Sequence, residues 1–216
     1  MNPSFLQRRR LLALLPIATA LLAACGQRTP KARPIAAGST VLALGDSLTS
    51  GVGADAATAY PAVLQELTGW QMVNGGVSGD TTAQALARLP ALLETHRPQL
   101  VIVGIGGNDF LRQMSAAAAR DNIRAICRAA TDSGAQVMLV AVPQFSLLAA
   151  GTGRLTDHPF YAELAGELNL PLYEAGWAEV LGNARLRSDQ IHANAQGYRQ
   201  FAEGLAQQMR KAGLLA

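Results

Sequence analysis

The segment "LALGDSLTSG", residues 42–51, places Ser47 where an apolar stretch meets a glycine-rich turn. A serine at such a position commonly serves the turn, because its hydroxyl can hydrogen-bond to nearby backbone groups. The same hydroxyl becomes a nucleophile when the chain also supplies a general base, an acid that orients the base, and donors for an oxyanion. A catalytic role for Ser47 therefore requires three partners elsewhere in the chain.

The segment "SDQIHANAQG", residues 188–197, supplies a candidate base and a candidate orienting acid. Asp189 and His192 lie three residues apart, so the carboxylate can bond one ring nitrogen within a single turn and leave the other facing outward. A surface loop before a helix N-cap is the alternative explanation of this segment. The other two histidines are less suitable, since His96 falls at a predicted helix end and His158 falls in a loop.

Two glycine-rich segments supply candidate donors for an oxyanion. "GGVSGDTT" contains Gly79, whose missing side chain lets its backbone N–H approach a substrate closely, and "GIGGND" contains the Asn108 amide. Each segment alone is equally compatible with an ordinary turn. We expect Asp46 and Asp109, which also follow predicted strands, to anchor their loops rather than to act as catalytic acids.

Together, "GDSLTSG", "GGVSGDTT", "GGND" and "DQIH" resemble, in this order, the four sequence blocks of the SGNH (GDSL) hydrolase family. The resemblance covers essentially all of residues 40–216. It implies that Ser47 is the nucleophile, that His192 is the general base and acid, and that Asp189 orients His192. It also implies an oxyanion hole with three donors: the N–H groups of Ser47 and Gly79 and the side chain of Asn108.

The resemblance also bears on the reaction. "ARLPALLETHRPQLVIVGIGGND" is similar to bacterial members with thioesterase, arylesterase and lysophospholipase activity. The implied activity is hydrolysis of carboxylic esters or thioesters, in small molecules or lipids, through an acyl-enzyme on Ser47, with no metal and no organic cofactor. Gln190 and Ala193 stand where the family commonly has glycine and proline, a departure that bears on the rate rather than on the mechanism. Residues 145–153, "FSLLAAGTG", either line an acyl pocket or form a plain loop.

Strand and helix patterns alternate along the chain. Apolar runs predict strands at 40–44, 70–74, 100–106, 136–142 and 170–175. Periodicity and capping signals predict helices at 61–69, 81–96, 116–134, 159–168 and 194–212. We expect the second of these helices to kink or restart at Pro90. The alternation predicts one α/β domain with a mostly parallel sheet, and the family resemblance implies a flavodoxin-like three-layer sandwich. Because ligands bind at the carboxyl ends of such strands, the candidate groups should share one edge of the sheet.

The N-terminal residues 1–24 have the pattern of a signal peptide, with three arginines followed by a short apolar run. That run is too short to span a bilayer comfortably. "LAAC" resembles a lipobox, which implies lipid attachment at Cys25, a tether over residues 25–39 and a catalytic domain over residues 40–216. The expected location is the bacterial cell envelope, on the outer membrane facing the periplasm. An ordinary secretory signal with a chance cysteine is the alternative, and "RRRLL" weakly resembles a twin-arginine signal.

The charge of the chain argues against nucleic acid as a partner. The whole chain carries 18 basic and 15 acidic side chains, a net charge of +3 and a pI near 9.2. Removal of the signal peptide removes three arginines, so that 15 basic and 15 acidic side chains remain. This balance predicts no basic patch. With Cys25 acylated, Cys127 has no disulfide partner, and we expect it to be a small core residue in a monomeric protein.

Three other functions are compatible with parts of the pattern. A two-metal phosphoesterase would need more histidine and carboxylate ligands than three histidines comfortably provide. A lipid-anchored binding or adhesion module could have kept the fold without activity. An envelope polysaccharide O-acetylesterase would use the same catalytic groups.

Overall fold

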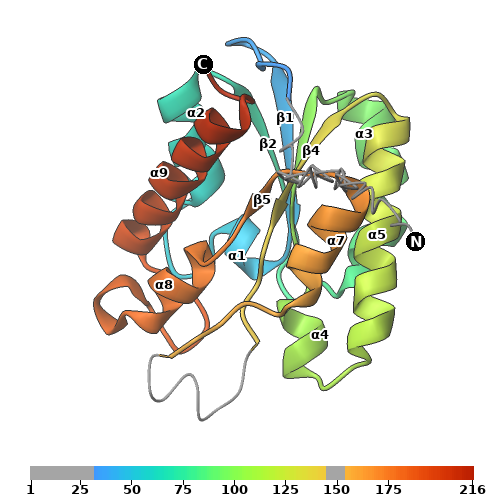
Figure 1. The fold of residues 1–216 in the computed structure, drawn as a ribbon. Coiled ribbons are helices and arrows are strands. Elements are labelled where there is room, and N and C mark those ends of the chain that lie inside the picture. Colours follow the sequence, from blue (N-terminus) through green and yellow to red (C-terminus); the bar gives the residue numbers. More distant parts are fainter. Residues whose placement is uncertain (1–31, 145–153) are drawn as a thin grey trace, which may run out of the picture.

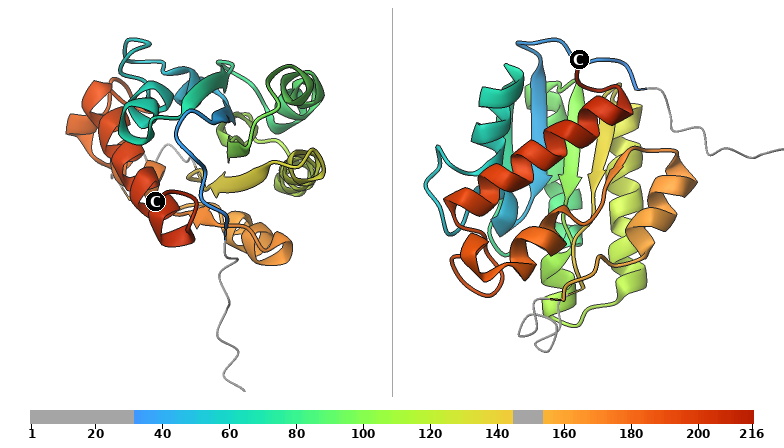
Figure 2. Two further views of the ribbon diagram at one scale, coloured as in Figure 1. Left: turned by 90° about the horizontal axis from the view of Figure 1, so that it is seen from above. Right: turned by 60° about the vertical axis from the view of Figure 1, so that its left-hand side comes forward.

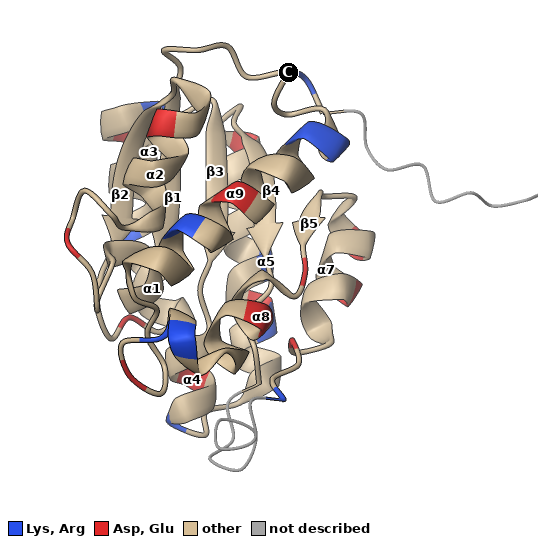
Figure 3. Cartoon of the chain, turned by 90° about the vertical axis from the view of Figure 1, so that its left-hand side faces the viewer, with Lys and Arg blue, Asp and Glu red and all other residues tan. Residues whose placement is uncertain are grey.

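The computed structural model describes residues 32–144 and 154–216. The predicted signal peptide, the predicted lipid site Cys25 and the segment 145–153 lie outside the described residues. The five strands of the sheet are β1 (Thr40–Gly45), β2 (Gln71–Gly76), β3 (Leu100–Gly104), β4 (Gln136–Val140) and β5 (Leu172–Tyr173). They lie in the order β2-β1-β3-β4-β5, and each neighbouring pair is parallel; Figure 1 shows the sheet nearly on edge, and Figure 3 labels the five strands in this order. This is the flavodoxin-like order, so the predicted fold class is confirmed.

Helices cover both faces of the sheet, as the two views of Figure 2 show. One layer packs against the sheet through α2, α8 and α9, and the other through α3, α5 and α7. The helices described are α1 (Ser47–Ser50), α2 (Tyr60–Thr68), α3 (Thr82–His96), α4 (Gly107–Leu111), α5 (Ala116–Asp132), α7 (Phe160–Leu168), α8 (Gly176–Gly182) and α9 (Ala195–Ala212), with a 3₁₀ turn at Ala184–Leu186. None of the described helices is long and apolar enough to span a membrane.

The central strand β1 divides the core between the two layers. Its residues are buried on both faces, with Val41 and Ala43 on the side of α9 and Leu42 and Leu44 on the side of α5. This arrangement explains why the strand reads as a continuous apolar run rather than as an alternating one. On the α9 side, the ring of Phe201 stacks on another ring, that of Trp177, with 3.6 Å between centroids.

Several predicted boundaries differ from the structure. Helix α3 is assigned as helix without interruption through Pro90, so the helix does not restart there. The third strand ends at Gly104 rather than at residue 106, because Gly106, at φ 132°, turns the chain into α4. The short helices α1, α4 and α8 were not predicted, since four to seven residues are too few to display a helical period.

The fold brings the ends of three strands together beside α1. Strands β1 and β3 are adjacent although β2 separates them in the sequence, so the strand order reverses between them, and in sheets of this kind ligands bind at such a point. Strand β2 also ends against α1: a Cβ on Gly76 would lie 2.2 Å from the backbone nitrogen of Ser50. The backbone that carries Ser47 is therefore packed directly on the end of β2.

We predict that Gly76→Ala destabilises the domain, because the nearest atoms to the added methyl are backbone atoms that cannot move aside. Overpacking of this kind costs about 1–3 kcal/mol, which corresponds to a fall of roughly 2–10 °C in Tm for a domain of this size. Gly166→Ala is the matched control. It lies within α7 with no atom within 4 Å of the added carbon, and we expect it to raise stability by about 0.5–1 kcal/mol. Thermal melts of the two variants test this difference, and equal Tm values would contradict it.

Candidate active site

Ser47 is the first residue of the short helix α1, directly after β1. Asp46 caps this helix, since its Oδ1 accepts a hydrogen bond of 3.0 Å from the backbone N–H of Leu48. The helix ends at Gly51, which adopts a left-handed conformation with φ 93°. A single capped turn therefore fixes the backbone of Ser47 at the carboxyl edge of the sheet, and its side chain remains partly exposed.

Three side chains form a continuous chain of hydrogen bonds. His192 Nε2 lies 3.0 Å from Ser47 Oγ, and His192 Nδ1 lies 2.7 Å from Asp189 Oδ2. The serine and the histidine are 145 residues apart in the sequence. The structure thus places the three residues that the sequence singled out in the order hydroxyl, imidazole, carboxylate.

Asp189 is held by its own turn as well as by the imidazole. Its Oδ1 accepts hydrogen bonds of 2.8 Å from the backbone N–H groups of Ile191 and His192. Partial burial of the carboxylate raises its pKa, but these bonds and the bond to the imidazole outweigh that effect and lower the pKa of Asp189 below its ordinary value. The carboxylate is therefore ionised at neutral pH and oriented on two sides.

The loop that carries His192 is closed despite its departures from the family pattern. The N–H of Ser188 donates to the carbonyl of His192 at 3.0 Å, and the side chain of Asn194 donates to the carbonyl of Arg185 at 2.8 Å. Asn194 also caps α9, as predicted, by accepting from the N–H of Gly197. Ala193, which stands where the family commonly has proline, is fully buried. These contacts hold the loop without that proline.

The turn around Gly79 faces the start of α4. Asn108 Nδ2 donates to the carbonyl of Asp80 at 2.9 Å, and Arg112 Nη2 donates to the carbonyl of Gly79 at 2.8 Å. Gly79 has φ 84°, a left-handed value that favours glycine. Among residues 32–144 and 154–216, neither the N–H of Ser47 nor that of Gly79 donates to a protein acceptor. The structure thus leaves both N–H groups unused.

Buried acidic side chains tie these loops to the sheet. Asp109 accepts from both the N–H and the hydroxyl of Thr82, at 2.9 and 2.7 Å. Asp80 accepts from Arg88 Nε at 2.7 Å, and the same guanidinium donates to the carbonyl of Gly45 at 2.9 Å. Asp109 thus joins the first turn of α3 to α4. Asp80, through Arg88, is joined to the end of β1. The anchoring role expected for Asp109 agrees with these bonds.

Sequence reasoning missed Arg88 and Arg112. Arg88 lies two helical turns after Thr81, the N-cap of α3, so its spacing is compatible with a side chain that reaches back toward the strand ends. Arg112 carries no comparable signal, because its contact with Gly79 depends on the unpredicted helix α4. Both arginines position backbone groups of the candidate site.

The remaining candidate residues lie outside this constellation. The His158 ring stacks on that of Phe110, with 4.9 Å between centroids. His96 lies in the last turn of α3. Cys127 is buried in the core, where burial raises its pKa to about 12. The described part of the chain contains no group of three or more His, Cys, Asp or Glu side chains arranged to hold a metal ion.

The arrangement of Ser47, His192 and Asp189 can activate the serine hydroxyl for attack on an acyl carbon. The imidazole is within hydrogen-bond reach of the hydroxyl, and the carboxylate orients the imidazole. The amide of Asn108 lies after the neighbouring strand β3, and its bond to the Asp80 carbonyl leaves one N–H that can donate to a negative oxygen. The same geometry recurs in serine hydrolases of unrelated folds.

Comparisons with known proteins agree with this geometry. Residues 43–200 match the GDSL-like Lipase/Acylhydrolase family. The protein named thioesterase 1/protease 1/lysophospholipase L1 of Escherichia coli (strain K12) is 37% identical over 183 residues, which cover 81% of this chain and 85% of that protein. The arylesterase of Vibrio mimicus is 30% identical over 185 residues, 79% of this chain and 88% of that protein. The crystal structure of TesA superimposes with a TM-score of 0.70 at 28% identity, covering 81% of this chain and 99% of that one. The chain therefore belongs to the GDSL-like lipase/acylhydrolase family and is an ester-hydrolysing enzyme.

Proposed function

We propose that the protein is a serine esterase that hydrolyses carboxylic ester or thioester bonds through an acyl-enzyme on Ser47. The observation that carries this proposal is the chain of two short hydrogen bonds, from Ser47 Oγ to His192 Nε2 and from His192 Nδ1 to Asp189 Oδ2. The names of the related proteins, which include esterase, thioesterase and arylesterase, support the same bond class.

The first half of the reaction forms the acyl-enzyme. Ser47 Oγ attacks the acyl carbon while its proton passes to His192 Nε2, and the carbonyl π electrons move onto oxygen. Asp189 stabilises the imidazolium that results. When the oxyanion collapses, the bond to the leaving oxygen or sulfur breaks, and His192 returns the proton to that atom. The alcohol or thiol then departs.

The second half releases the acid. A water molecule gives its proton to His192 Nε2 as its oxygen attacks the acyl carbon of the ester on Ser47. Collapse of the second oxyanion breaks the bond to Ser47 Oγ, which regains the proton. Water is the only co-reactant that the balance requires.

We assign the oxyanion hole to three donors, namely the N–H groups of Ser47 and Gly79 and the side-chain amide of Asn108. The bond from Asn108 to the Asp80 carbonyl uses one amide hydrogen and leaves the other for substrate. Arg112 holds the Gly79 carbonyl and so limits rotation of that turn. The donors are fixed before substrate arrives, which is what makes such a hole effective.

Apolar side chains near these loops favour substrates with an apolar acyl or aryl group. Among the described residues, four large hydrophobic residues have exposed fractions of 37–46%: Val52, Val77, Leu111 and Met114. All four lie in the segments that follow β1, β2 or β3. Apolar side chains exposed beside the catalytic loops can contact an apolar part of a substrate. Hydrolysis rates for alkyl and aryl esters of increasing acyl length would define the substrate.

We further propose that the enzyme is lipid-anchored through Cys25 in the bacterial envelope, facing the periplasm. The lipobox-like "LAAC" supports this anchor, together with the basic and apolar segments that precede it. This location separates the enzyme from the cytosol, so cytosolic thioesters are poor candidates for its natural substrate.

Asp46 is a buried carboxylate next to the nucleophile. Burial raises its pKa from 3.8 to about 6, against the bond from the Leu48 N–H, which lowers it. At a pH between these two values the folded chain binds this proton and the unfolded chain does not, so stability falls as the pH rises through this window. Above pH 6 the ionised side chain reduces the free energy of unfolding by about 3 kcal/mol.

We predict that Ser47→Ala and Asn108→Ala differ in kind. Ser47→Ala removes the attacking atom, so labelling by a fluorophosphonate and turnover should both disappear. Asn108→Ala keeps the nucleophile and the base, so it should still be labelled, more slowly, and should lose about 10²–10³ in kcat. Thermal melts serve as the control for folding. Wild-type turnover by folded Ser47→Ala would show that Ser47 is only a turn residue.

We predict that Asp46→Asn removes a pH-dependent loss of stability. Asparagine keeps an oxygen that can cap α1 but cannot ionise. The variant should gain stability relative to wild type as the pH rises from about 4 to above 6, by up to about 3 kcal/mol. Melts of both proteins across this range measure the difference. A difference in Tm that stays constant with pH would contradict the assignment to Asp46.

We predict that Cys25→Ser abolishes membrane attachment without abolishing activity. The wild-type protein should sediment with membranes, whereas the variant should be soluble or incompletely processed. Cys127→Ser is the matched control, since it removes the buried cysteine and leaves the lipobox intact. Recovery of unmodified wild-type protein in the soluble periplasmic fraction would disprove the anchor.

A further inference from the structure

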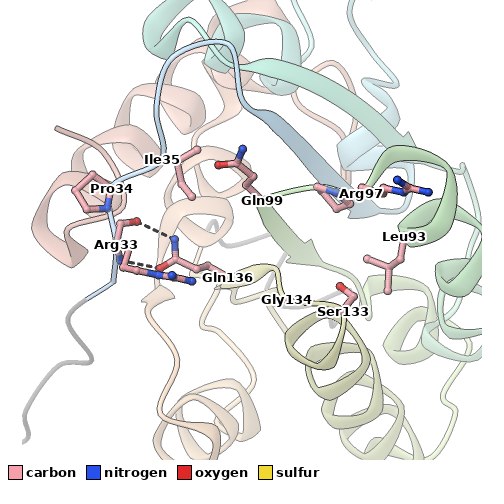
Figure 4. A pocket seen from close by; sticks show the side chains of 10 residues that line it. Arg33, Pro34, Ile35, Leu93, Arg97, Gln99, Ser133, Gly134 and Gln136 are labelled. Atoms are coloured by element: carbon pink, nitrogen blue, oxygen red, sulfur yellow. Dashed lines mark hydrogen bonds between the residues drawn. The ribbon is translucent and has the colours of Figure 1, made fainter.

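A cavity lies at the opposite end of the sheet from Ser47. It has a volume of about 550 Å³ and opens at the amino ends of β3 and β4 (Figure 4). Two arginines, Arg33 and Arg97, contribute to opposite sides of its wall, with Gln99 between them. No carboxylate lies among the described residues that line it. The cavity therefore offers a positive site at some distance from the catalytic groups.

Ser133 and Gln136 in the cavity wall already form hydrogen bonds, whereas the two arginines and the Gln99 amide offer donors that no described residue is shown to use. Neither Arg33 nor Arg97 forms an ion pair with a described residue. Gln99 accepts a hydrogen bond from Ser39 through Oε1, which leaves its amide hydrogens free to donate. Arg97 also occupies the left-handed C-cap of α3 at φ 43°, where glycine is the usual residue. These features fit a ligand with several negative oxygens, such as a phosphate ester.

The chain enters the domain at this end. Gln136 bonds both backbone groups of Arg33, accepting from its N–H at 2.7 Å and donating to its carbonyl at 2.8 Å. The N–H of Ile35 donates to the carbonyl of Leu214. Cys25 precedes Arg33 by eight residues, which can span at most about 28 Å. A lipid on Cys25 would therefore keep this end of the domain close to a bilayer surface.

Basic side chains outnumber acidic ones among the exposed described residues at this end. Arg210 and Lys211 are exposed at the end of α9, close to the point where the described chain begins (Figure 3). The sequence adds two more basic residues between Cys25 and Arg33 and has no acidic residue before Asp46. Two exposed carboxylates, at 94 and 132, lie on neighbouring helix ends. The described residues of this end therefore carry a local excess of basic over acidic side chains, which a sum over the whole chain does not show.

We propose that the cavity, here called the basal cavity, binds the phosphate headgroups of an anionic lipid surface. The location of the enzyme at a membrane rests on the proposed lipid anchor at Cys25. The contact between the basal cavity and headgroups does not require that anchor. A lipid chain and basic side chains together hold a protein on a membrane more firmly than either does alone. The short tether keeps headgroups at a high local concentration, so individually weak contacts are sufficient.

This orientation directs the active site away from the membrane. Strand β1 spans about 20 Å, and Ser47 follows its carboxyl end, whereas the basal cavity lies at the amino end of the sheet. An enzyme docked through the basal cavity would therefore take substrates from the aqueous side rather than from the leaflet that holds it. Binding to the membrane should leave the catalytic rate on a soluble ester unchanged.

The test uses the chain from residue 25 onward with Cys25→Ser, so that neither a lipid nor the basic and apolar residues of the predicted signal peptide contribute to binding. Co-sedimentation with vesicles of phosphatidylcholine, with and without phosphatidylglycerol, measures the contact. We expect binding only to the anionic vesicles and its loss at high salt. Arg33→Gln combined with Arg97→Gly should weaken binding roughly 30-fold, because each basic side chain near an anionic surface contributes about a factor of five. Glycine suits the left-handed backbone at position 97, so this variant should fold.

A control variant with the same loss of charge separates the basal cavity from a general charge effect. Arg120→Gln combined with Arg199→Gln removes two arginines near the start of α5 and α9, toward the catalytic end. This control should bind as the parent does, and saturating vesicles should leave kcat/KM for a soluble ester unchanged within about twofold.

Equal weakening by both variants, or binding of glycerol phosphate without binding of vesicles, would overturn the proposal. A change in kcat/KM on vesicles would overturn the orientation. Because lipid attachment is assayed separately by Cys25→Ser in cells, failure here and failure of the anchor are distinguishable.

Discussion

Close packing of backbone against backbone at the ends of β1, β2 and β3 is the constraint on which the active site depends. A Cβ on Gly45 would lie 2.0 Å from Thr49 Oγ1 and 2.5 Å from the carbonyl oxygen of Gly104. The turn that carries Ser47 can therefore lie directly on two neighbouring strands. Only this proximity lets the Arg88 guanidinium reach the Gly45 carbonyl while also binding Asp80. The sheet thus fixes the turn that carries Ser47, and hydrogen bonds between the loops, such as those of Asn108 and Arg112, position the others on it.

The buried Asp46 shows that this arrangement costs stability. Its carboxylate caps α1, yet burial raises its pKa to about 6, so the ionised form is disfavoured at neutral pH. A neutral cap such as serine or asparagine would satisfy the same N–H without that penalty. Local destabilisation of this kind is common where a backbone conformation must be held for function. Here the hydrogen bond to the Leu48 N–H holds the turn that presents Ser47, and the burial of the carboxylate is the cost.

Features that depend on local patterns could be predicted from the sequence. The buried strands appear as apolar runs, and the long helices α5 and α9 carry caps and a clear period. The candidate residues were found because each follows a strand or precedes a helix. Contacts that depend on unpredicted short helices could not be found, and the bond from Arg112 to Gly79 is the clearest case. The 3.0 Å approach of His192 to Ser47 joins residues 145 apart, and only the family resemblance anticipated it.

The helix dipole explains some of the basic residues at the end of the domain that holds the basal cavity, but it does not explain Arg33. Helix C-termini are negative ends of the helix dipole and favour cations in their last turn, which accounts for Arg210 and Lys211 on α9. Arg97 at the end of α3 fits the same rule. Arg33 does not, because it belongs to no helix and its backbone is clamped by Gln136 beside the cavity. Helix stability therefore explains much of the positive charge of this end, but not why a second arginine, without an ion-pair partner among the described residues, lines the same cavity, whose described wall has no carboxylate.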